Sequence, residues 1–276
     1  MSIAIVTDST SDIPGNLLSC HNIHQIPVTL TLDNQTYQDG FDLSREKFYS
    51  WLPDMPSFPT TGAPSTGSFQ KLYHQLFSRG HTEIISIHAA SNLSGICNAA
   101  RIAGRDFENR VHVYDSQQLS MGLGYQVLAA ARAAADQIPL EKIISTLDDF
   151  KKKIRVFALL DSFKYIHRSG RVSWAKTRLG SLLKIKPLVE LEAGSVIQRG
   201  LARARSQGIK LLTGTLDKLG DLSELSILHT NAEEEGKMLQ QYFASRVPEL
   251  PLLVNVTTII GSHVGPNGLG FAAVVK

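Results

Sequence analysis

The chain has 276 residues, of which 43% are hydrophobic and 19% are charged, and its formal net charge is +3. This length suits one large domain or two ordinary ones, and no apolar run approaches the roughly 18–20 residues that a membrane span requires. Cys20 and Cys97 are too few for a disulfide framework and lack the spacing of metal ligands. The first residues lack the basic start of a signal peptide, so we expect a cytoplasmic protein with reduced thiols.

The first part of the chain alternates between short β-rich runs and helical patterns. Strands are predicted at 2–8, 83–89, 111–116 and 155–161, and helices at 69–80, 96–107, 124–137 and 139–154. This alternation favours an N-terminal α/β domain over 1–160, built on a parallel sheet with flanking helices. Four prolines in 52–64 indicate a loop, and the 52–80 region is a candidate to cross to a second domain.

The second part, 161–276, mixes helices with strands that pair antiparallel. Two β-like runs flank Ala193-Gly194, which is a hairpin signal. Further along, the pattern predicts helices at 206–219 and 231–246, and strands at 224–230, 252–260 and 270–276. We therefore expect a C-terminal mixed α/β domain.

Positive charge is concentrated in residues 164–210, called here the basic stretch. It holds eleven Lys or Arg and two Glu, a net charge of +9. Such a block either attracts an acidic partner or an anionic ligand, or is a solvated basic face. Nucleic acid is the weaker interpretation, because the stretch has no interleaved aromatic residues and no zinc or RNP-type motif.

Two loops of small, hydroxyl-bearing residues precede predicted helices, "TTGAPSTG" at 60–67 and "AASNLSG" at 89–95. Ser91 is expected to cap the second helix, with Ser94 in its first turn. The amides at a helix start attract anions, although Ser and Thr at such positions usually serve only as caps.

Two further residues are candidates for binding a ligand. His263 is expected in a glycine-framed turn between two β runs, where backbone can approach a ligand closely. Arg171, in "HRSGRVS", is suited to a carboxylate or a phosphate. A nucleophilic device using Ser94 and His263 stays open as an alternative, although no G-x-S-x-G elbow is present.

Other motifs give no site. Asp8 and Asp12 in "VTDSTSDIP" lack a further ligand at useful spacing, so capping of the helix near Ile13–Pro14 is preferred to a magnesium site. No G-x-G-x-x-G follows the first strand, which argues against a dinucleotide cofactor.

In order and spacing, seven segments together resemble the DegV family of bacterial fatty-acid-binding proteins. The similarity spans nearly the whole chain and rests on "VTDSTSDIP", "TTGAPS", "AASNLSGICNAA", "VYDSQQLSMGLG", "FKYIHRSGRVS", "LLKIKPLVELEAG" and "IIGSHVGPNGLGF". The resemblance implies a two-domain α/β fold with a ligand tunnel between the domains.

The resemblance also implies a function. It predicts a lipid-binding carrier that holds a long-chain fatty acid, with the acyl chain buried and the carboxylate at the interdomain cleft. No cofactor, metal or catalysis by the chain itself is implied. Some family members present the carboxylate to a separate ATP-dependent fatty-acid kinase, which makes acyl-phosphate for phospholipid metabolism, so such a kinase is a candidate partner.

By matching position, Thr61 and Ser94 are expected to bond the carboxylate, with His263 and Arg171 also at the site. Ser91 and Gly95, in the same segment as Ser94, complete the predicted ligand-binding set. Arg203 falls at an arginine that family members use in kinase docking.

The chain also departs from the family pattern. Gly62-Ala63 stands where Ser-Gln is usual after the threonine, and Ile96-Cys97 where Thr-Tyr is common.

Overall fold

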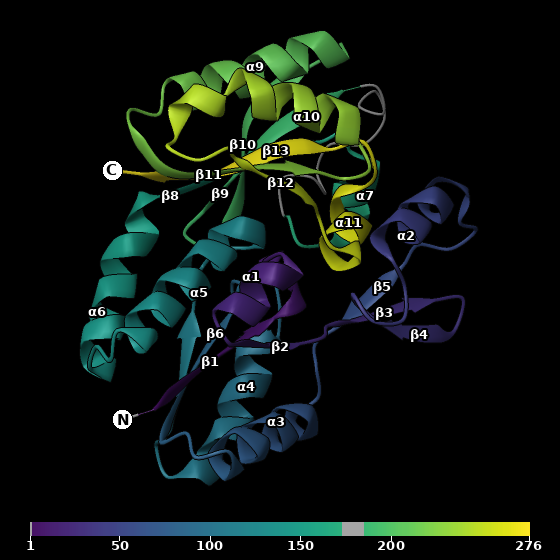
Figure 1. Cartoon of the computed structure of the whole chain (residues 1–276). Helices are drawn as coiled ribbons and strands as arrows, with labels where there is room; N and C mark the ends of the chain where they lie inside the picture. Colours follow the sequence, from purple (N-terminus) through teal and green to yellow (C-terminus); the bar gives the residue numbers. More distant parts are fainter. Residues whose placement is uncertain (1, 173–184) are drawn as a thin grey trace.

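A computed structural model describes residues 2–172 and 185–276, and these residues form three sheets (Figure 1). The strand orders are β2-β1-β6-β7, β10-β9-β8-β13-β11-β12 and β4-β3-β5. The strands are β1 Ile3–Asp8, β2 Ile23–Ile26, β3 Thr29–Leu32, β4 Gln35–Gln38, β5 Thr60–Gly62, β6 Glu83–His88, β7 Val111–Asp115, β8 Ile154–Leu159, β9 Lys186–Glu192, β10 Ser195–Ala202, β11 Leu222–His229, β12 Leu252–Asn255 and β13 Leu269–Val275.

Helices cover both large sheets. The α-helices are α1 Gly15–Cys20, α2 Arg45–Trp51, α3 Thr66–Ser78, α4 Ile96–Gly104, α5 Ser120–Ala135, α6 Leu140–Phe150, α7 Lys164–Ser169, α9 Arg205–Asp217, α10 Glu233–Tyr242 and α11 Thr258–Val264. Short 3-10 helices lie at η1 Ser9–Ser11, η2 Leu52–Asp54, η3 Arg105–Phe107, η4 Lys151–Lys153 and η5 Ala244–Arg246. None of the helices in the described part of the chain is long and apolar enough to cross a membrane.

The first sheet confirms the predicted N-terminal arrangement. All its strand pairs are parallel. Helix α5 contacts β1 and β6 on one face, and α4 contacts β6 and β7 and packs beside α3. Strands covered on both faces are expected to be almost continuously apolar, and the burial of β1 and β6 follows this rule.

The second sheet is mixed, as predicted for the C-terminal part. Only β11 and β12 pair in parallel among its described strands; the other pairs are antiparallel. Helices α9 and α10 lie on its outer side, and α5 lies between the two large sheets (Figure 1). The hairpin between β9 and β10 turns at Ala193 and Gly194, both with positive φ, which confirms that prediction.

One predicted strand belongs to a different sheet from the one expected. The run at 155–161 was assigned to the N-terminal domain, but β8 pairs with β13 and β9 in the second sheet. Local β propensity predicts a strand without specifying its partner, and the partners of β8 come later in the chain. A domain limit at residue 160 stays a prediction, and the pairing of β8 favours an earlier limit.

Strands β3, β4 and β5 with helix α2 form a projection called here the small lobe (Figure 1). Phe48 and Tyr49 of α2 are fully buried. The following segment reaches the C-terminal part, because the Phe58 and Tyr165 rings lie 5.4 Å apart. The proline-rich region after α2 therefore does contact the second part of the chain, as its composition suggested.

The C-terminal prediction was wrong for residues 258–260. They open helix α11 instead of continuing a strand, so His263 lies in the last turn of a helix and not in a turn between strands. The Thr257 side chain caps this helix by accepting the N–H of Ile260. β-Branched residues favour strands only weakly, and here capping and tertiary contacts decide the outcome.

Candidate functional site

Two cavities lie side by side between the N-terminal loops, α11 and the second sheet. They share the walls formed by Leu119, Val196, Ile260 and Val264. One, the polar cavity, has a volume of about 140 Å³, and its lining includes hydroxyl groups, a guanidinium and an imidazole ring among apolar side chains. The other, the apolar cavity, has a volume of about 100 Å³ and an apolar wall. A ligand that spans both cavities would need a polar head and a hydrophobic tail.

The polar cavity brings together five of the six predicted ligand-binding residues. Its lining includes Thr61, Ser94, Gly95, Arg171 and His263. They come from β5, the loop before α4, the segment after α7, and α11. Segments far apart in the sequence thus meet at one place.

Ser91 is the exception. Its N–H lies 3.3 Å from Oδ1 of Asp115, and its hydroxyl donates to Oδ2 of the same carboxylate. Nor does it cap α4, because the N-cap is Gly95. The prediction that Ser91 caps this helix was wrong; a carboxylate at the end of β7 takes its hydroxyl instead.

The position of Thr61 follows from strand pairing. Thr61 lies opposite Leu30 in the antiparallel β3–β5 pair, and the Thr29 hydroxyl donates to the Gly62 carbonyl at 2.9 Å. A Cβ at residue 62 would lie 2.8 Å from the Thr29 hydroxyl oxygen, so Gly62 leaves room for this bond. Gly62, which departs from the family pattern, therefore leaves the space that the Thr29 hydroxyl occupies.

The loop that carries Ser94 is pinned at several points. The N–H groups of Leu93 and Ser94 both donate to the Ala90 carbonyl, at 3.0 and 3.1 Å. Helix α4 begins at Ile96, and its N-cap, Gly95, provides no side-chain acceptor. The first-turn amides of α4 thus have no side-chain cap next to a cavity, which suits an anionic group.

Asp8 joins this loop to the loop that follows β1. Its carboxylate accepts the N–H and the hydroxyl of Thr10, and also His88 Nδ1 at 2.9 Å and the N–H of Ala89 at 3.2 Å. Thr10 lines the polar cavity, although the sequence does not single it out. Asp8 caps the short helix η1 and not the helix near Ile13–Pro14, so the capping prediction was wrong for Asp8. Asp12 does not cap α1, whose N-cap is Pro14.

His263 is held against Thr61. Its Nε2 lies 3.0 Å from Oγ1 of Thr61. Burial, with a smaller contribution from the Arg171 guanidinium, lowers the pKa of His263 to about 4. The ring is therefore neutral near pH 7 and carries a single N–H.

This arrangement offers little to a nucleophilic mechanism. The described hydrogen bond of the His263 ring goes to Thr61 and not to Ser94. The carboxylates that end β1 and β7, Asp8 and Asp115, bond to His88 and Ser91 and not to the His263 ring. Within residues 2–172 and 185–276, no group of three His, Cys, Asp or Glu is placed to hold a metal ion.

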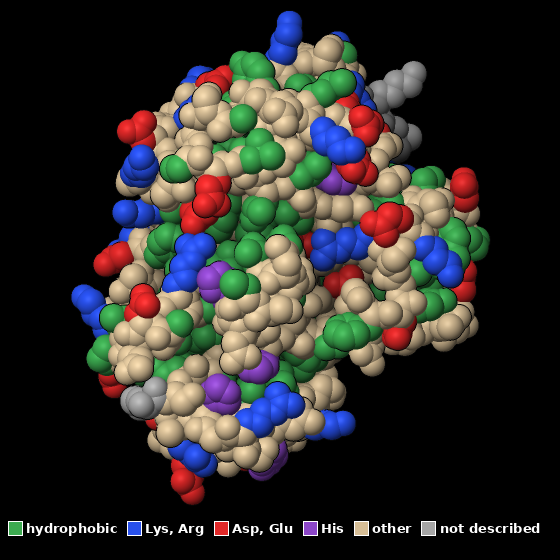
Figure 2. Space-filling view, viewed as in Figure 1, with side chains coloured by type: hydrophobic (Ala, Val, Ile, Leu, Met, Phe, Trp, Pro, Cys, Tyr) green, Lys and Arg blue, Asp and Glu red, His purple; other side chains and the backbone are tan. Residues whose placement is uncertain are grey.

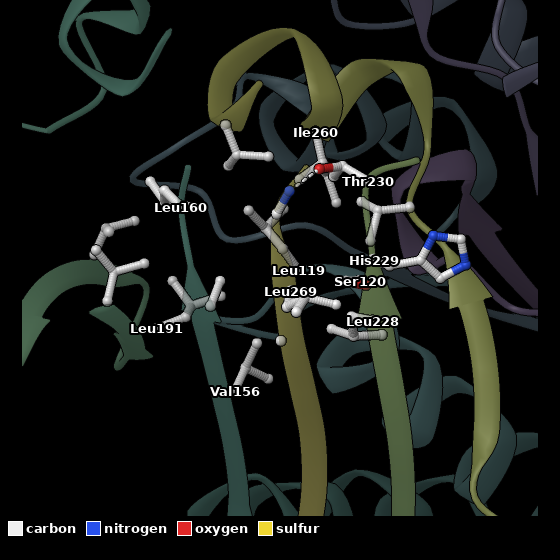
Figure 3. A pocket seen from close by; sticks show the side chains of 17 residues that line it. Leu119, Ser120, Val156, Leu160, Leu191, Leu228, His229, Thr230, Ile260 and Leu269 are labelled. Atoms are coloured by element: carbon white, nitrogen blue, oxygen red, sulfur yellow. Dashed lines mark hydrogen bonds between the residues drawn. The ribbon is translucent and has the colours of Figure 1, made fainter. Parts of the chain in front are cut away.

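The apolar cavity lies against the inner face of the second sheet (Figure 3). Val156, Leu191, Leu228 and Leu269 project from neighbouring strands, and Leu119 closes the side nearest α5. Two polar residues of the wall are already bonded: the Thr230 hydroxyl accepts the N–H of Gly268, and the Ser120 hydroxyl donates to Asp12. An apolar cavity of this kind stays dry and favours a hydrocarbon guest.

Three of the described cations in the basic stretch are paired with acidic residues. Lys186 pairs with Asp161, Arg199 with Glu190 and Glu192, and Arg205 with Glu235. On the face shown in Figure 2, Lys and Arg are interspersed with Asp and Glu and do not form a continuous basic surface. Lys176, Arg178 and Lys184 lie outside the described residues. Arg203 is exposed and does not line either cavity.

Comparison with known proteins finds relatives of one family, the DegV family. A family model described as "Uncharacterised protein, DegV family" matches residues 2–276. A DegV domain-containing protein of Listeria innocua is 31% identical, with 99% of each chain covered. Protein DegV of Bacillus subtilis is 30% identical, with 98% of each covered.

Solved structures are similar over the full length. A DegV family protein from Thermus thermophilus, described for its fatty-acid binding, gives a TM-score of 0.91 at 28% identity, with 100% of both chains covered. DegV of Bacillus subtilis, described as a fatty-acid-binding protein, gives 0.89 at 29% identity, again with 100% of both chains covered. The α/β architecture of the chain is therefore that of these proteins.

Proposed function

The chain belongs to the DegV family, and we propose that it binds a long-chain fatty acid. The observation that carries this proposal is the adjacency of the two cavities: an apolar cavity and a cavity with hydroxyl groups in its lining share a wall of four apolar residues. The carboxylate would lie in the polar cavity and the acyl chain in the apolar one. The fatty-acid ligands of the relatives from Thermus thermophilus and Bacillus subtilis support the same assignment.

The polar cavity meets the needs of a buried carboxylate. Such a group is costly to bury unless it gains charged partners or several hydrogen bonds. Thr61, Ser94 and the uncapped amides of α4 supply donors, and Arg171 is the cation among the described lining residues. A carboxylate held mostly by neutral donors needs no close ion pair.

The apolar cavity provides the affinity. Each buried methylene contributes roughly 0.8 kcal/mol, so a long acyl chain has a large gross driving force. Ordering of the chain and loss of free motion offset much of it. The head group then decides which lipid is held and how it is oriented.

We further propose that the protein is a carrier that does no chemistry alone and presents the carboxylate to a separate fatty-acid kinase. Support comes from the resemblance of the chain to the DegV family and from the lining of the polar cavity. This lining includes Arg171, an exposed residue. A cytoplasmic location is proposed with it, since both cysteines are free thiols.

Extraction under denaturing conditions followed by mass spectrometry tests the binding function. Purified protein is expected to release about one long-chain fatty acid per chain. Protein that carries none, takes up none from fatty-acid solutions and turns over ester substrates unaided would instead favour a hydrolase using Ser94 and His263.

A further inference from the structure

Helix α11 follows β12 in the sequence, yet residues of the N-terminal part hold its first turn. The N–H and the hydroxyl of Thr258 both donate to Oδ1 of Asp39, at 3.2 and 2.7 Å. The N–H of Thr257 donates to Oδ1 of Asp12 at 2.9 Å. Two carboxylates from the region before α2 thus satisfy amides that a helix start otherwise leaves unpaired.

Both carboxylates are buried, with 2% of Asp39 and 1% of Asp12 exposed. Asp12 also accepts the Ser120 hydroxyl at 2.6 Å and lies 3.3 Å from the Arg45 guanidinium. Burial, opposed by the charge of Arg45, raises the pKa of Asp12 to about 6. Burying two acids is costly, and residues at the start of α11 donate hydrogen bonds to both of them.

The rest of α11 is fitted to its neighbours by close packing. A Cβ at Gly261 would collide with the Tyr49 ring of α2, and one at Gly265 with the Tyr165 ring of α7. The Tyr49 hydroxyl donates to the Val256 carbonyl at 2.9 Å, just before the helix. The helix is therefore held at its start by charge and along its length by aromatic rings.

The other end of α11 forms part of the site. His263 reaches Thr61 in the polar cavity, and Ile260 and Val264 line both cavities. Because α11 has only seven residues, a shift of its first turn is transmitted to His263. The same Asp12 also holds Ser120, whose neighbour Leu119 lines both cavities together with Ile260 and Val264.

We propose that Asp39 and Asp12 are positioning residues for the head-group site. By tying the first turn of α11 to the N-terminal part, they hold His263 against Thr61 and so determine the preference for a carboxylate head. Neither side chain lines the polar cavity, so both act through α11. This inference rests on the proposed fatty-acid function and adds residues that the sequence did not predict for the site.

The test compares two ligands with the same tail, hexadecanoic acid and hexadecanol. Asp39→Ala removes the acceptor, and Thr258→Val removes the hydroxyl donor while keeping the shape of the side chain. Asp42→Ala is the matched control, since Asp42 is an exposed carboxylate of the same loop that accepts the N–H of Gln38. Thermal unfolding checks that each variant is folded.

Asp39→Ala is expected to lower the preference for the acid over the alcohol by about tenfold, the value of roughly one hydrogen bond to a charged group. The control should retain the preference. A second readout needs no ligand: in an NMR titration, the His263 ring of Asp39→Ala should protonate at higher pH than in the wild type, because the ring becomes more exposed to solvent. Thr258→Val should show both effects in weaker form.

Equal loss of affinity for both ligands in Asp39→Ala, with the His263 titration unchanged, would overturn the proposal and make Asp39 a purely structural residue. If the wild type shows no preference for the acid, the fatty-acid function fails. The His263 titration then still decides the positioning role: a shift supports it and an unchanged curve contradicts it.

Discussion

Oγ1 of Thr61 lies 3.0 Å from Nε2 of His263, although 202 residues separate them along the chain. Since the ring is neutral, the direction of this bond depends on which nitrogen holds the proton. If Nε2 carries it, His263 donates to Thr61 and the Thr61 hydroxyl stays free to donate to a ligand. The other tautomer would use the Thr61 proton for the ring and leave the cavity one donor short.

We therefore expect the Nε2–H tautomer in the protein bound to a fatty acid. Nitrogen-15 NMR of the imidazole distinguishes the two tautomers. Detection of the Nδ1–H form in the lipid-bound protein would show that Thr61 does not donate to the carboxylate.

Ser94→Ala and Thr61→Val should each weaken fatty-acid binding by roughly 1–3 kcal/mol, the usual cost of leaving a buried charged acceptor without one donor. Titration with a fluorescent fatty acid measures the change. Ser91→Ala is the control, because Ser91 bonds to Asp115 and does not line the polar cavity. Unchanged affinity in both site variants would refute the placement of the carboxylate.

Ala158→Phe should exclude long acyl chains, because Ala158 lines the apolar cavity and a benzyl group would fill much of its 100 Å³. Extraction and mass spectrometry of the purified variant are expected to give little or no lipid. Ile102→Phe, which enlarges an exposed side chain on α4, should leave the lipid in place. A full lipid complement in Ala158→Phe would mean that the acyl chain lies elsewhere.

His263 should contribute to the pH dependence of stability. Its pKa is about 4 in the folded protein and near 6.5 when unfolded, so the unfolded chain binds the proton more tightly between these values. The contribution of His263 to the free energy of unfolding is complete above pH 6.5 and is lost as the pH falls toward 4. The total loss is about 3 kcal/mol at most. Denaturant unfolding of the wild type and of His263→Gln at several pH values measures it as a difference.

The difference between the wild type and His263→Gln isolates the effect of His263, because Asp12 changes the stability with pH in the opposite direction. Its raised pKa favours the folded state at low pH, and this contribution is lost as the pH rises toward 6. Since Asp12 is present in both proteins, its effect cancels in the comparison. Identical pH profiles for the wild type and His263→Gln would contradict the burial of a neutral imidazole.

Arg203→Glu should leave bound lipid unchanged and slow acyl-phosphate formation by a cognate fatty-acid kinase. Arg203 is exposed and lines neither cavity, while reversal of a rim charge acts on association with a partner. Lipid content and phosphorylation rate are measured on the same preparation. Loss of lipid, or an undiminished rate, would argue against a docking role.

Most strands of the large sheets could be predicted because they have clear local periodicity, although the short strand β2 was missed. The alternation of apolar strands with helical patterns before residue 137 corresponds to β1, β6, β7 and α3–α5. The hairpin at Ala193-Gly194 followed from turn chemistry. The partner of β8 could not be predicted in this way, since pairing with β13 depends on residues more than a hundred positions away.

The site was predicted less evenly. Thr61, Ser94 and His263 were identified through the resemblance and do line one cavity. Thr10 was missed, because a hydroxyl after a strand is indistinguishable from a simple cap. The start of the helix that carries His263 was mistaken for a strand and its end for a turn. "VTTII" has the β-branched composition of a strand, and the carboxylates that hold the start of the helix lie more than two hundred residues away.

The long separation between Asp39 and Thr258 has a consequence for biosynthesis. The N-terminal strands can pair while the ribosome is still extending the chain, but the pocket has no α11 wall until residue 264 has left the exit tunnel. Contacts of such long range also form late in folding, since loop closure is costly before they stabilise the structure. If the chain binds a fatty acid as proposed, loading must follow translation, because a nascent chain, however well folded at its N-terminal end, has no complete compartment to fill.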